Sequence, residues 1–165
     1  MRRSYFALAL LLAFLMPVAV QSTETELRPF ERGSWQQLTK AHAGRPTIVH
    51  FWGVTCGPCK VELPQLGAFM KEHPAIDMVT ISADFVPNLP AAARAMLERS
   101  GLAAAENWIF DGFADRLRFE IDPTWQGDIP RTLLITPEGE MTTIEGSAEM
   151  TELAQWSARQ LSAKK

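Results

Sequence analysis

The sequence predicts an α/β fold, in which a central mixed β-sheet has helices on both of its faces. The run Thr47–Trp52 is apolar and β-branched without polar alternation, which indicates a strand covered on both sides. A second apolar, β-rich run follows at 76–83, and segments with helical periodicity lie between the strands. Two further strand-like runs, 132–136 and Met141–Glu145, flank four turn-forming residues and predict an antiparallel hairpin. Strands that first alternate with helices and then pair as a hairpin are typical of a mixed sheet.

The first 22 residues have the pattern of a secretory signal peptide. Two arginines precede an apolar run at 5–20, and a polar segment begins at Gln21. The apolar run is shorter than the ~20 residues that a transmembrane helix needs, and it contains a proline near its end. We therefore expect residues 1–22 to be a signal peptide or an N-terminal anchor. Residues 23–165 should form one domain outside the cytoplasm, where a disulfide can persist.

The domain begins with an extra segment ahead of its first strand. Residues 24–33 are polar and are expected to be a loose lead-in. Ser34 and Gln37 then form a capping-box pattern, which predicts a short helix that ends near Ala41.

The middle of the domain is expected to repeat strand and helix. After Thr47–Trp52, Pro58 stands at a favoured first helical position, and the apolar spacing continues the helix to about Glu72. The strand at 76–83 is followed by a helix at 90–100, which a glycine ends.

An insert separates this part from the hairpin. It contains a short apolar run at 108–110, which suits an added strand, and a helical turn or two at 113–119. After the hairpin, apolar residues at helical spacing over 153–161 predict a final helix capped near Ser147.

Composition excludes several functional classes. With 16 basic and 19 acidic side chains the net charge is −3, so the chain offers no basic surface for a phosphate backbone and no nucleic-acid partner is expected. Two cysteines and three histidines cannot build a four-ligand structural zinc site without carboxylates. Two cysteines also form one disulfide at most, which excludes a miniprotein held together by several disulfides.

The clearest chemical signal is a pair of cysteines three residues apart. Cys56-Gly57-Pro58-Cys59 spans the junction between the buried strand and the helix after it. The free N–H groups and the dipole of a helix N-terminus stabilise an anion, so the Cys56 thiol should be unusually acidic. Cys59, one helical turn later, is placed to attack a mixed disulfide formed at Cys56. The pattern therefore favours thiol–disulfide exchange.

Two cysteines at this spacing also occur in metal sites and in structural disulfides. Half a zinc site fails for lack of further cysteines. A copper(I) clip stays open, because soft thiolates select copper(I). A purely structural bridge between such close neighbours would close a very short loop and add little stability.

The cysteine segment resembles thioredoxin. Residues 51–60, with Pro64 five positions past the second cysteine, carry this resemblance. The signal-like N-terminus, the residues from Glu62 to Pro64 and the region 81–99 are similar to the exported TlpA/ResA/DsbE type of thiol–disulfide oxidoreductase. The match extends over about 28–161 at the level of element order, and it implies a thioredoxin fold with an insert before the proline loop.

The second motif of the resemblance is the segment from Gly127 to Thr132. It is similar to the loop of the family that contains a cis-proline, which implies a cis bond before Pro130. In the family this loop faces the cysteines, and its backbone pairs with a bound substrate chain.

Two titratable residues stand near the cysteines by resemblance. His50 occupies the position where thioredoxin has a buried acid that assists proton transfer at the second cysteine. It either serves the same purpose at Cys59 or is a core histidine bonded to the backbone, and both readings stay open. Glu62 matches a glutamate that the exported family keeps near its cysteines. It is expected to tune their pKa values, although a glutamate in the first helical turn also suits the helix dipole.

The resemblance also implies a substrate surface around the cysteines. Trp52 is expected beside the disulfide, and Trp125 either lines a substrate groove or belongs to the core. The expected substrate-binding residues are Trp52, Gly57, Pro58, Ile129 and Trp125.

The resemblance implies a periplasmic protein-disulfide reductase. Cys56 would attack and Cys59 resolve, and a Gly-Pro pair between them is similar to that of reducing members. The implied partners are exported proteins with thiols or disulfides, for example in cytochrome c maturation or metal-site assembly, and a membrane thiol electron donor. Membrane contact is expected only if the N-terminal segment stays uncleaved. No metal or organic cofactor is implied, because the cysteine pair itself carries two electrons.

Two alternatives use the same cysteines. One is a copper(I) chaperone that binds without turnover. The other is a thiol peroxidase, which the sequence disfavours because Thr55 lies directly before Cys56 and no P-x-x-x-T-x-x-C pattern is present.

Overall fold

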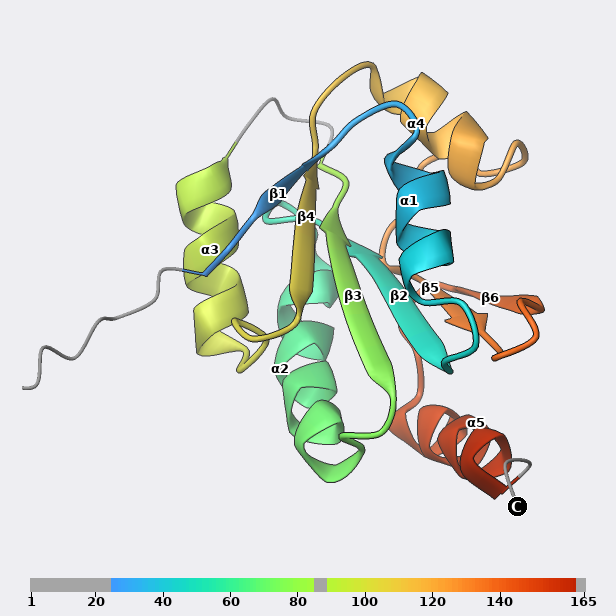
Figure 1. Ribbon diagram of the computed structural model, residues 1–165. Helices are drawn as coiled ribbons and strands as arrows, with labels where there is room; N and C mark the ends of the chain where they lie inside the picture. Colours follow the sequence, from blue (N-terminus) through green and yellow to red (C-terminus); the bar gives the residue numbers. More distant parts are fainter. Residues whose placement is uncertain (1–24, 85–88, 163–165) are drawn as a thin grey trace, which may run out of the picture.

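A six-stranded sheet forms the centre of the protein (Figure 1). The computed structural model describes residues 25–84 and 89–162, so the segment 1–22, expected to be a signal peptide or anchor, lies outside the described residues. Within these two ranges, no helix is both long enough and apolar enough to cross a membrane.

The sheet is mixed, as expected. Its strand order is β1-β4-β3-β2-β5-β6, with the first four strands parallel and β5 and β6 each antiparallel to its neighbours. The strands are β1 Arg28–Phe30, β2 Thr47–Trp52, β3 Asp77–Ser82, β4 Glu106–Phe110, β5 Arg131–Ile135 and β6 Met141–Glu145. The hairpin β5–β6 joins the parallel strands because β5 pairs with β2. β2 is therefore a central strand, with β3 on one side and β5 on the other.

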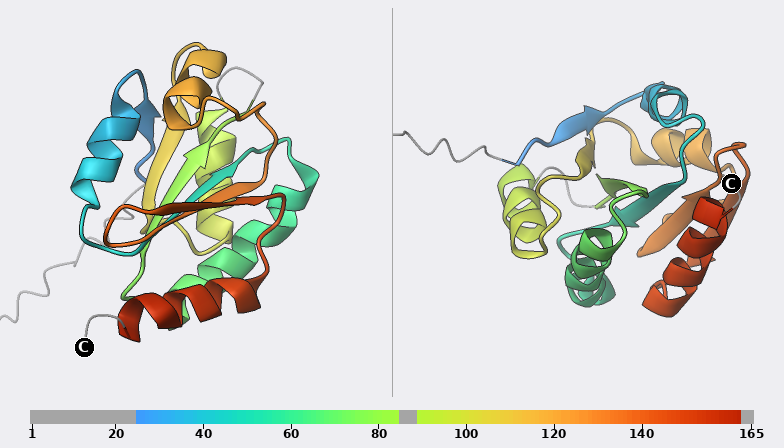
Figure 2. Two further views of the ribbon diagram at one scale, coloured as in Figure 1. Left: turned by 90° about the vertical axis from the view of Figure 1, so that its right-hand side faces the viewer. Right: turned by 60° about the horizontal axis from the view of Figure 1, so that its bottom comes forward.

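Helices cover both faces of the sheet (Figure 2). The helices of the described chain are α1 Ser34–Ala41, α2 Gly57–Glu72, α3 Pro90–Arg99, α4 Ala114–Ile121 and α5 Met150–Ser162. In the right-hand view of Figure 2, α2, α3 and α5 lie on one face, and α1 and α4 lie on the other. α2 runs through Pro64 as one helix.

Each face of the sheet has its own apolar core. Ile48 and Trp52 of β2 point into the core beneath α2, α3 and α5, whereas Val49 and Phe51 point into the core beneath α1 and α4. All six residues of β2 are buried, which is the reason that its sequence shows no polar alternation.

The lead-in is more ordered than expected. Arg28–Phe30 forms β1, which pairs with β4 in parallel at one edge of the sheet. Phe30 is fully buried and stacks on Phe110 with ring centroids 5.4 Å apart. The strand has only three residues and one buried side chain, so the local sequence carries little sign of it.

The expected capping box is wrong. Gly33, with φ 83°, is the N-cap of α1, and no side chain caps the helix. The hydroxyl of Ser34 instead accepts a hydrogen bond from the Glu31 N–H at 2.9 Å, so it stabilises the turn before the helix. A left-handed backbone at that position suits glycine, which has no Cβ.

Candidate active site

The two cysteines lie where β2 ends and α2 begins. Cys56 and Cys59 form a disulfide, with Cα atoms 5.3 Å apart. Cys56 is partly exposed, whereas Cys59 is fully buried. A sulfur of another protein can therefore reach Cys56 and not Cys59.

Cys56 is the N-cap of α2. Its Sγ accepts a hydrogen bond from the backbone N–H of Cys59 at 3.2 Å. Pro58 occupies the first turn, where its missing N–H costs no helical bond. Because helix N-terminal N–H groups and the helix dipole stabilise negative charge, the reduced Cys56 is held where a thiolate is favoured.

The loop before β5 lies against Cys56. The Ile129–Pro130 peptide bond is cis, as expected. The carbonyl oxygen of Ile129 is 3.7 Å from Sγ of Cys56. Arg131 pairs with Phe51 in the neighbouring strand, which places this loop beside the end of β2. The structure thus brings the proline loop and the cysteine segment together.

Asp84, just after β3, holds the cysteine loop and was not anticipated from the sequence. Its carboxylate accepts hydrogen bonds from the N–H of Val54 at 2.7 Å, the N–H of Thr55 at 3.2 Å and the hydroxyl of Thr55 at 2.8 Å. Gly53 makes room for it, because a Cβ there would lie 2.4 Å from Asp84 Oδ1 and 2.9 Å from Ile129 Cδ1. An acid directly after a strand beside the cysteine strand is the one signal that points to such a contact.

Glu62 lies on the same face of α2 as Cys59, one turn further on. Its side chain is 2% exposed, and Oε1 accepts a hydrogen bond from the Ala148 N–H at 2.9 Å. Oε2 has no hydrogen-bond partner among the residues that the structure describes. Glu62 therefore ties α2 to the segment before α5.

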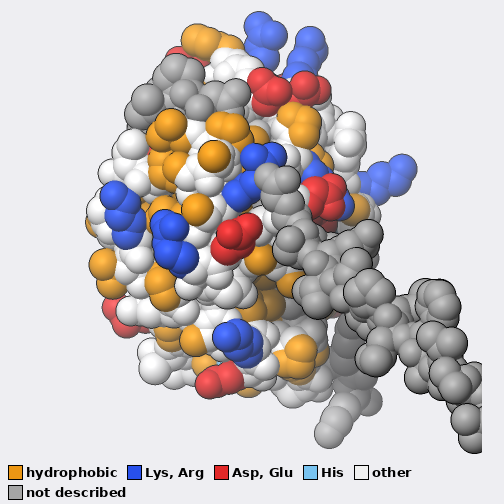
Figure 3. Space-filling view, turned by 90° about the vertical axis from the view of Figure 1, so that its left-hand side faces the viewer, with side chains coloured by type: hydrophobic (Ala, Val, Ile, Leu, Met, Phe, Trp, Pro, Cys, Tyr) orange, Lys and Arg blue, Asp and Glu red, His pale blue; other side chains and the backbone are white. Residues whose placement is uncertain are grey.

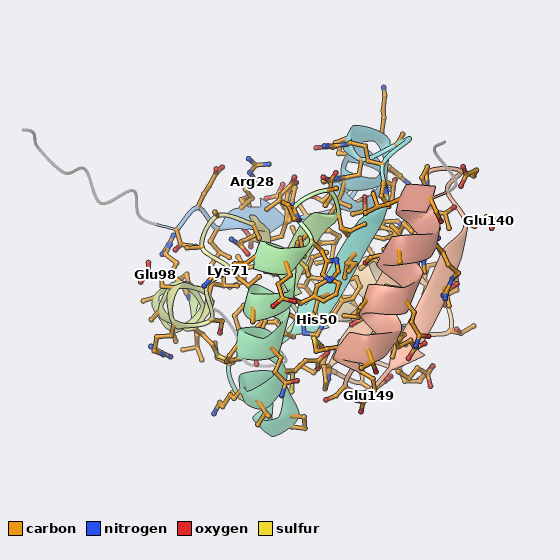
Figure 4. All side chains as sticks on the ribbon, turned by 90° about the horizontal axis from the view of Figure 1, so that it is seen from below. Arg28, His50, Lys71, Glu98, Glu140 and Glu149 are labelled. Atoms are coloured by element: carbon orange, nitrogen blue, oxygen red, sulfur yellow. A yellow bond between two sulfur atoms is a disulfide. The ribbon has the colours of Figure 1, made fainter. Side chains whose placement is uncertain are left out.

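His50 lies in the same buried region (Figure 4), between α2, α5 and the sheet. Its Nδ1 is 2.9 Å from the hydroxyl of Thr132 and 3.9 Å from Oε1 of Glu62. Its Nε2 has no hydrogen-bond partner within residues 25–84 and 89–162.

Burial shifts these two groups in opposite directions. It raises the pKa of the Glu62 carboxyl, against hydrogen bonds from Ala148 and Ser147 that lower this pKa. It lowers the pKa of His50 to about 3, so the imidazole is uncharged at neutral pH. The pKa of Glu62 is thus shifted towards neutral pH, where a carboxyl can both donate and accept a proton, and the pKa of His50 is shifted away from neutral pH.

Comparison with known proteins agrees with this geometry. No protein-family model matches the chain. Sporulation thiol-disulfide oxidoreductase A of Bacillus subtilis (strain 168) is 25% identical over 128 residues, which are 76% of this chain and 70% of that protein. The crystal structure of StoA from Bacillus subtilis is 27% identical, with a TM-score of 0.53, over 70% of this chain and 84% of that one. A thioredoxin-related protein from Neisseria meningitidis serogroup B has a TM-score of 0.61 at 24% identity, over 83% of this chain and 99% of that one.

The fold is thioredoxin-like. In sequence and in structure the chain is similar to the thiol–disulfide oxidoreductase StoA, and it has a cysteine pair joined as a disulfide.

Two of the expected contact residues, Trp52 and Trp125, are buried in the structure. Trp52 is fully buried and packs in the same core as Cys59, because it points to the α2 side of β2. Trp125 is 5% exposed and packs against Phe51 in the other core, with its indole N–H donating to the Asp128 carbonyl at 2.9 Å. Trp52 therefore belongs to the core beside the buried cysteine, and Trp125, for which both positions were open, belongs to the other core.

The other expected contact residues surround Cys56 at the surface. Gly57 and Pro58 are exposed, and Ile129 is partly exposed. The accessible surface next to the sulfur therefore consists of the start of α2 on one side and the proline loop on the other.

Proposed function

We propose that the protein is an exported thiol–disulfide oxidoreductase that reduces disulfides of other proteins in the periplasm. The observation that supports this most is the unequal pair of cysteines at the start of α2. Cys56 is reachable and lies 3.7 Å from the Ile129 carbonyl, while Cys59 is buried one turn behind it. The sulfur of Cys56 can react with a client, whereas the sulfur of Cys59 can react only with Cys56.

Exchange at this pair proceeds in two steps. The Cys56 thiolate attacks one sulfur of the client disulfide, whose S–S bond breaks, and the client's other sulfur leaves as a thiolate and takes up a proton. The Cys59 thiolate then attacks Sγ of Cys56, which forms the internal disulfide and releases the second client thiol. The client gains two electrons, and a dithiol donor at the membrane must return two electrons to the pair.

Glu62 is the group best placed to handle the proton of Cys59. It shares a helix face with this cysteine, it is buried, and burial raises its pKa. His50 has a pKa near 3 and contacts Glu62 and Thr132, so its role is to position the carboxyl. A client backbone would pair with the Ile129–Pro130 loop while its sulfur meets Cys56.

The reducing direction rests on the Gly57-Pro58 pair between the cysteines and on the resemblance to reducing members. Apocytochrome c and metal-site assembly proteins are the clients that such a reductase would serve. The reduction potential decides the direction, and we expect a value closer to the ~−270 mV of thioredoxin than to the ~−120 mV of a strong oxidant.

Trapping identifies the clients. Cys59→Ser removes the resolving thiol, so mixed disulfides should accumulate at Cys56 and be found by mass spectrometry of the exported fraction. Cys56→Ser is the matched control and should trap nothing. A potential near that of the strong oxidants, or no adduct on Cys56, would overturn the proposal.

The two alternatives are separated by simple assays. A copper(I) chaperone would hold one copper per dithiol and would fail to reduce the disulfides of insulin, and burial of Cys59 disfavours it because both thiolates must bind the metal. A thiol peroxidase would consume peroxide at a rate that depends on Cys56.

A further inference from the structure

A groove between α2 and α3 begins beside the cysteines. It has a volume of about 370 Å³, and its walls include Val54, Lys60, Pro64, Met96 and Arg99. We call it the basic groove.

The basic groove is connected to the active site through the chain itself. Val54 lies two residues before Cys56, and Lys60 directly follows Cys59. Val54 is also held by Asp84, which fixes the cysteine loop. A client joined to Cys56 would therefore have Ile129 on one side of the sulfur. The groove residues Val54 and Lys60 belong to the same loop and to the first turn of α2.

The far end of the groove is fixed by close helix packing. Gly67 of α2 lies against Ser100, which also lines the groove, since a Cβ on Gly67 would be only 1.7 Å from the Ser100 carbonyl oxygen. The walls are thus two helices in direct contact, so the groove is a built feature of the fold.

Its charge is positive although the chain is acidic overall. Lys60 and Arg99 are both exposed, and within residues 25–84 and 89–162 neither forms an ion pair. Figure 3, whose near face carries α3, shows Lys and Arg side chains set among hydrophobic and some acidic ones. Glu98, the acid next to Arg99, instead accepts a hydrogen bond from Thr25 at 3.0 Å.

We propose that the basic groove binds an acidic side chain that neighbours the disulfide in a client protein. This rests on the proposed disulfide exchange and adds a specificity to it. The apolar wall formed by Val54, Pro64 and Met96 suits the aliphatic stem of a glutamate, and Lys60 and Arg99 meet its carboxylate. Such complementarity acts on encounter and partner choice more than on the chemical step.

Disulfide peptides that differ at one position test this. A series with Glu, Gln or Lys at each position near the cystine is reduced by the full-length protein, and each kcat/KM is divided by the rate with dithiothreitol to remove the peptide's own reactivity. We expect the Glu peptide to exceed the Gln peptide by about threefold to tenfold at low salt, and this excess to vanish near ~1 M salt.

Charge reversal locates the effect. Arg99→Glu should abolish the preference for Glu and favour the Lys peptide, and Lys60→Gln should weaken it. Because every comparison is a ratio between two peptides on one variant, a change in cysteine reactivity cancels. Lys40→Glu is the matched control, since Lys40 is exposed on α1, on the other face of the sheet from α2 and α3, and should leave the ratio unchanged.

Each outcome bears on a different claim. If the Gln peptide is reduced but the Glu peptide gains nothing, or if Lys40→Glu acts like Arg99→Glu, the basic groove has no such role and disulfide exchange stands. If no peptide is reduced, the proposed function fails and the specificity fails with it.

Discussion

At the scale of single residues, the two buried titratable groups beside the cysteines differ in what they can do. His50 stands at the position expected of a proton carrier, yet complete burial lowers its pKa to about 3. Glu62, one turn from Cys59, has its pKa raised by the same physical cause. Desolvation always opposes the charged form, so it makes a buried acid weaker and a buried base weaker as well.

Glu62→Gln tests the raised pKa through stability. The ordinary pKa of a glutamate is 4.5, and the folded protein keeps this proton to a higher pH than the unfolded chain does. Stability contributed by Glu62 is therefore lost as pH rises from 4.5 through the raised pKa. Glutamine cannot ionise, so the variant should gain stability relative to wild type at pH 7 compared with pH 4. Urea unfolding of the oxidised proteins measures this, with Glu140→Gln in the exposed turn as control.

His50→Gln tests the lowered pKa with the opposite sign. Between pH 6.5, the ordinary pKa of histidine, and about pH 3, His50 is protonated in the unfolded chain and stays neutral in the folded protein. Wild-type stability should thus fall as pH falls through this window, by at most about 1.4 kcal/mol per pH unit from this residue. Glutamine keeps a partner for Thr132 and cannot be protonated, so its decline should be shallower. If the free energy of unfolding falls with pH equally steeply for wild type and His50→Gln, the lowered pKa of His50 is wrong.

At the scale of elements, the turn between β2 and α2 is shaped by a residue that follows β3. Asp84 accepts two backbone N–H groups of this turn, and Gly53 leaves the space that its carboxylate occupies. Asp84 therefore helps to fix the turn from which α2 starts, with Cys56 as its N-cap.

Gly53→Ala should destabilise the oxidised protein by roughly 1–3 kcal/mol, because its Cβ would overlap Asp84 and the Ile129 side chain. Gly57→Ala is the control, since a Cβ on Gly57 would meet nothing within 4 Å. Thermal unfolding of both variants checks this. Equal stability would show that the turn yields to an extra methyl group.

What the sequence predicts well is local. The buried strand Thr47–Trp52, the cysteines at the start of α2 and the hairpin each leave a pattern within a few residues. The Ile129–Pro130 loop needed the family resemblance, because its approach to Cys56 comes from the pairing of β5 with β2, two strands that lie about half the chain apart in the sequence.

What it misses are contacts between distant segments. β1 carries only one buried side chain, so its sequence gives little sign of a strand. Asp84 has the sequence context of an ordinary turn residue, and only the structure shows that it accepts three hydrogen bonds from Val54 and Thr55. Trp125 follows the insert closely, and only tertiary packing decides that it lies under Phe51 and not over the active site. An aromatic residue near a functional loop has both options, and composition does not separate them.

At the scale of the whole molecule, two apolar cores share one sheet. The side chains of β2 alternate between them, so neither core can be lost without freeing the strand that carries the active site. This predicts a single cooperative transition in spite of the two separate helix layers.

Leu38→Ala on α1 and Leu63→Ala on α2 test this, one in each core. Both leucines are almost fully buried, so each variant should lose about 2–5 kcal/mol. In urea, far-ultraviolet circular dichroism and tryptophan fluorescence should report the same midpoint for each variant. Two separate midpoints for either variant would mean that the helix layers melt independently.

The strand order also decides when the surroundings of the cysteines are completed during synthesis. β2 stands between β3, its next strand in the chain, and β5, which begins only at Arg131. A nascent chain that has emerged as far as β4 already carries both thiols, yet it lacks Ile129 and the strand that closes β2 on that side. Such a fragment has both thiols without the proline loop that lies against Cys56 in the folded protein. The contact between Ile129 and Cys56 therefore forms only when the C-terminal strands have been made.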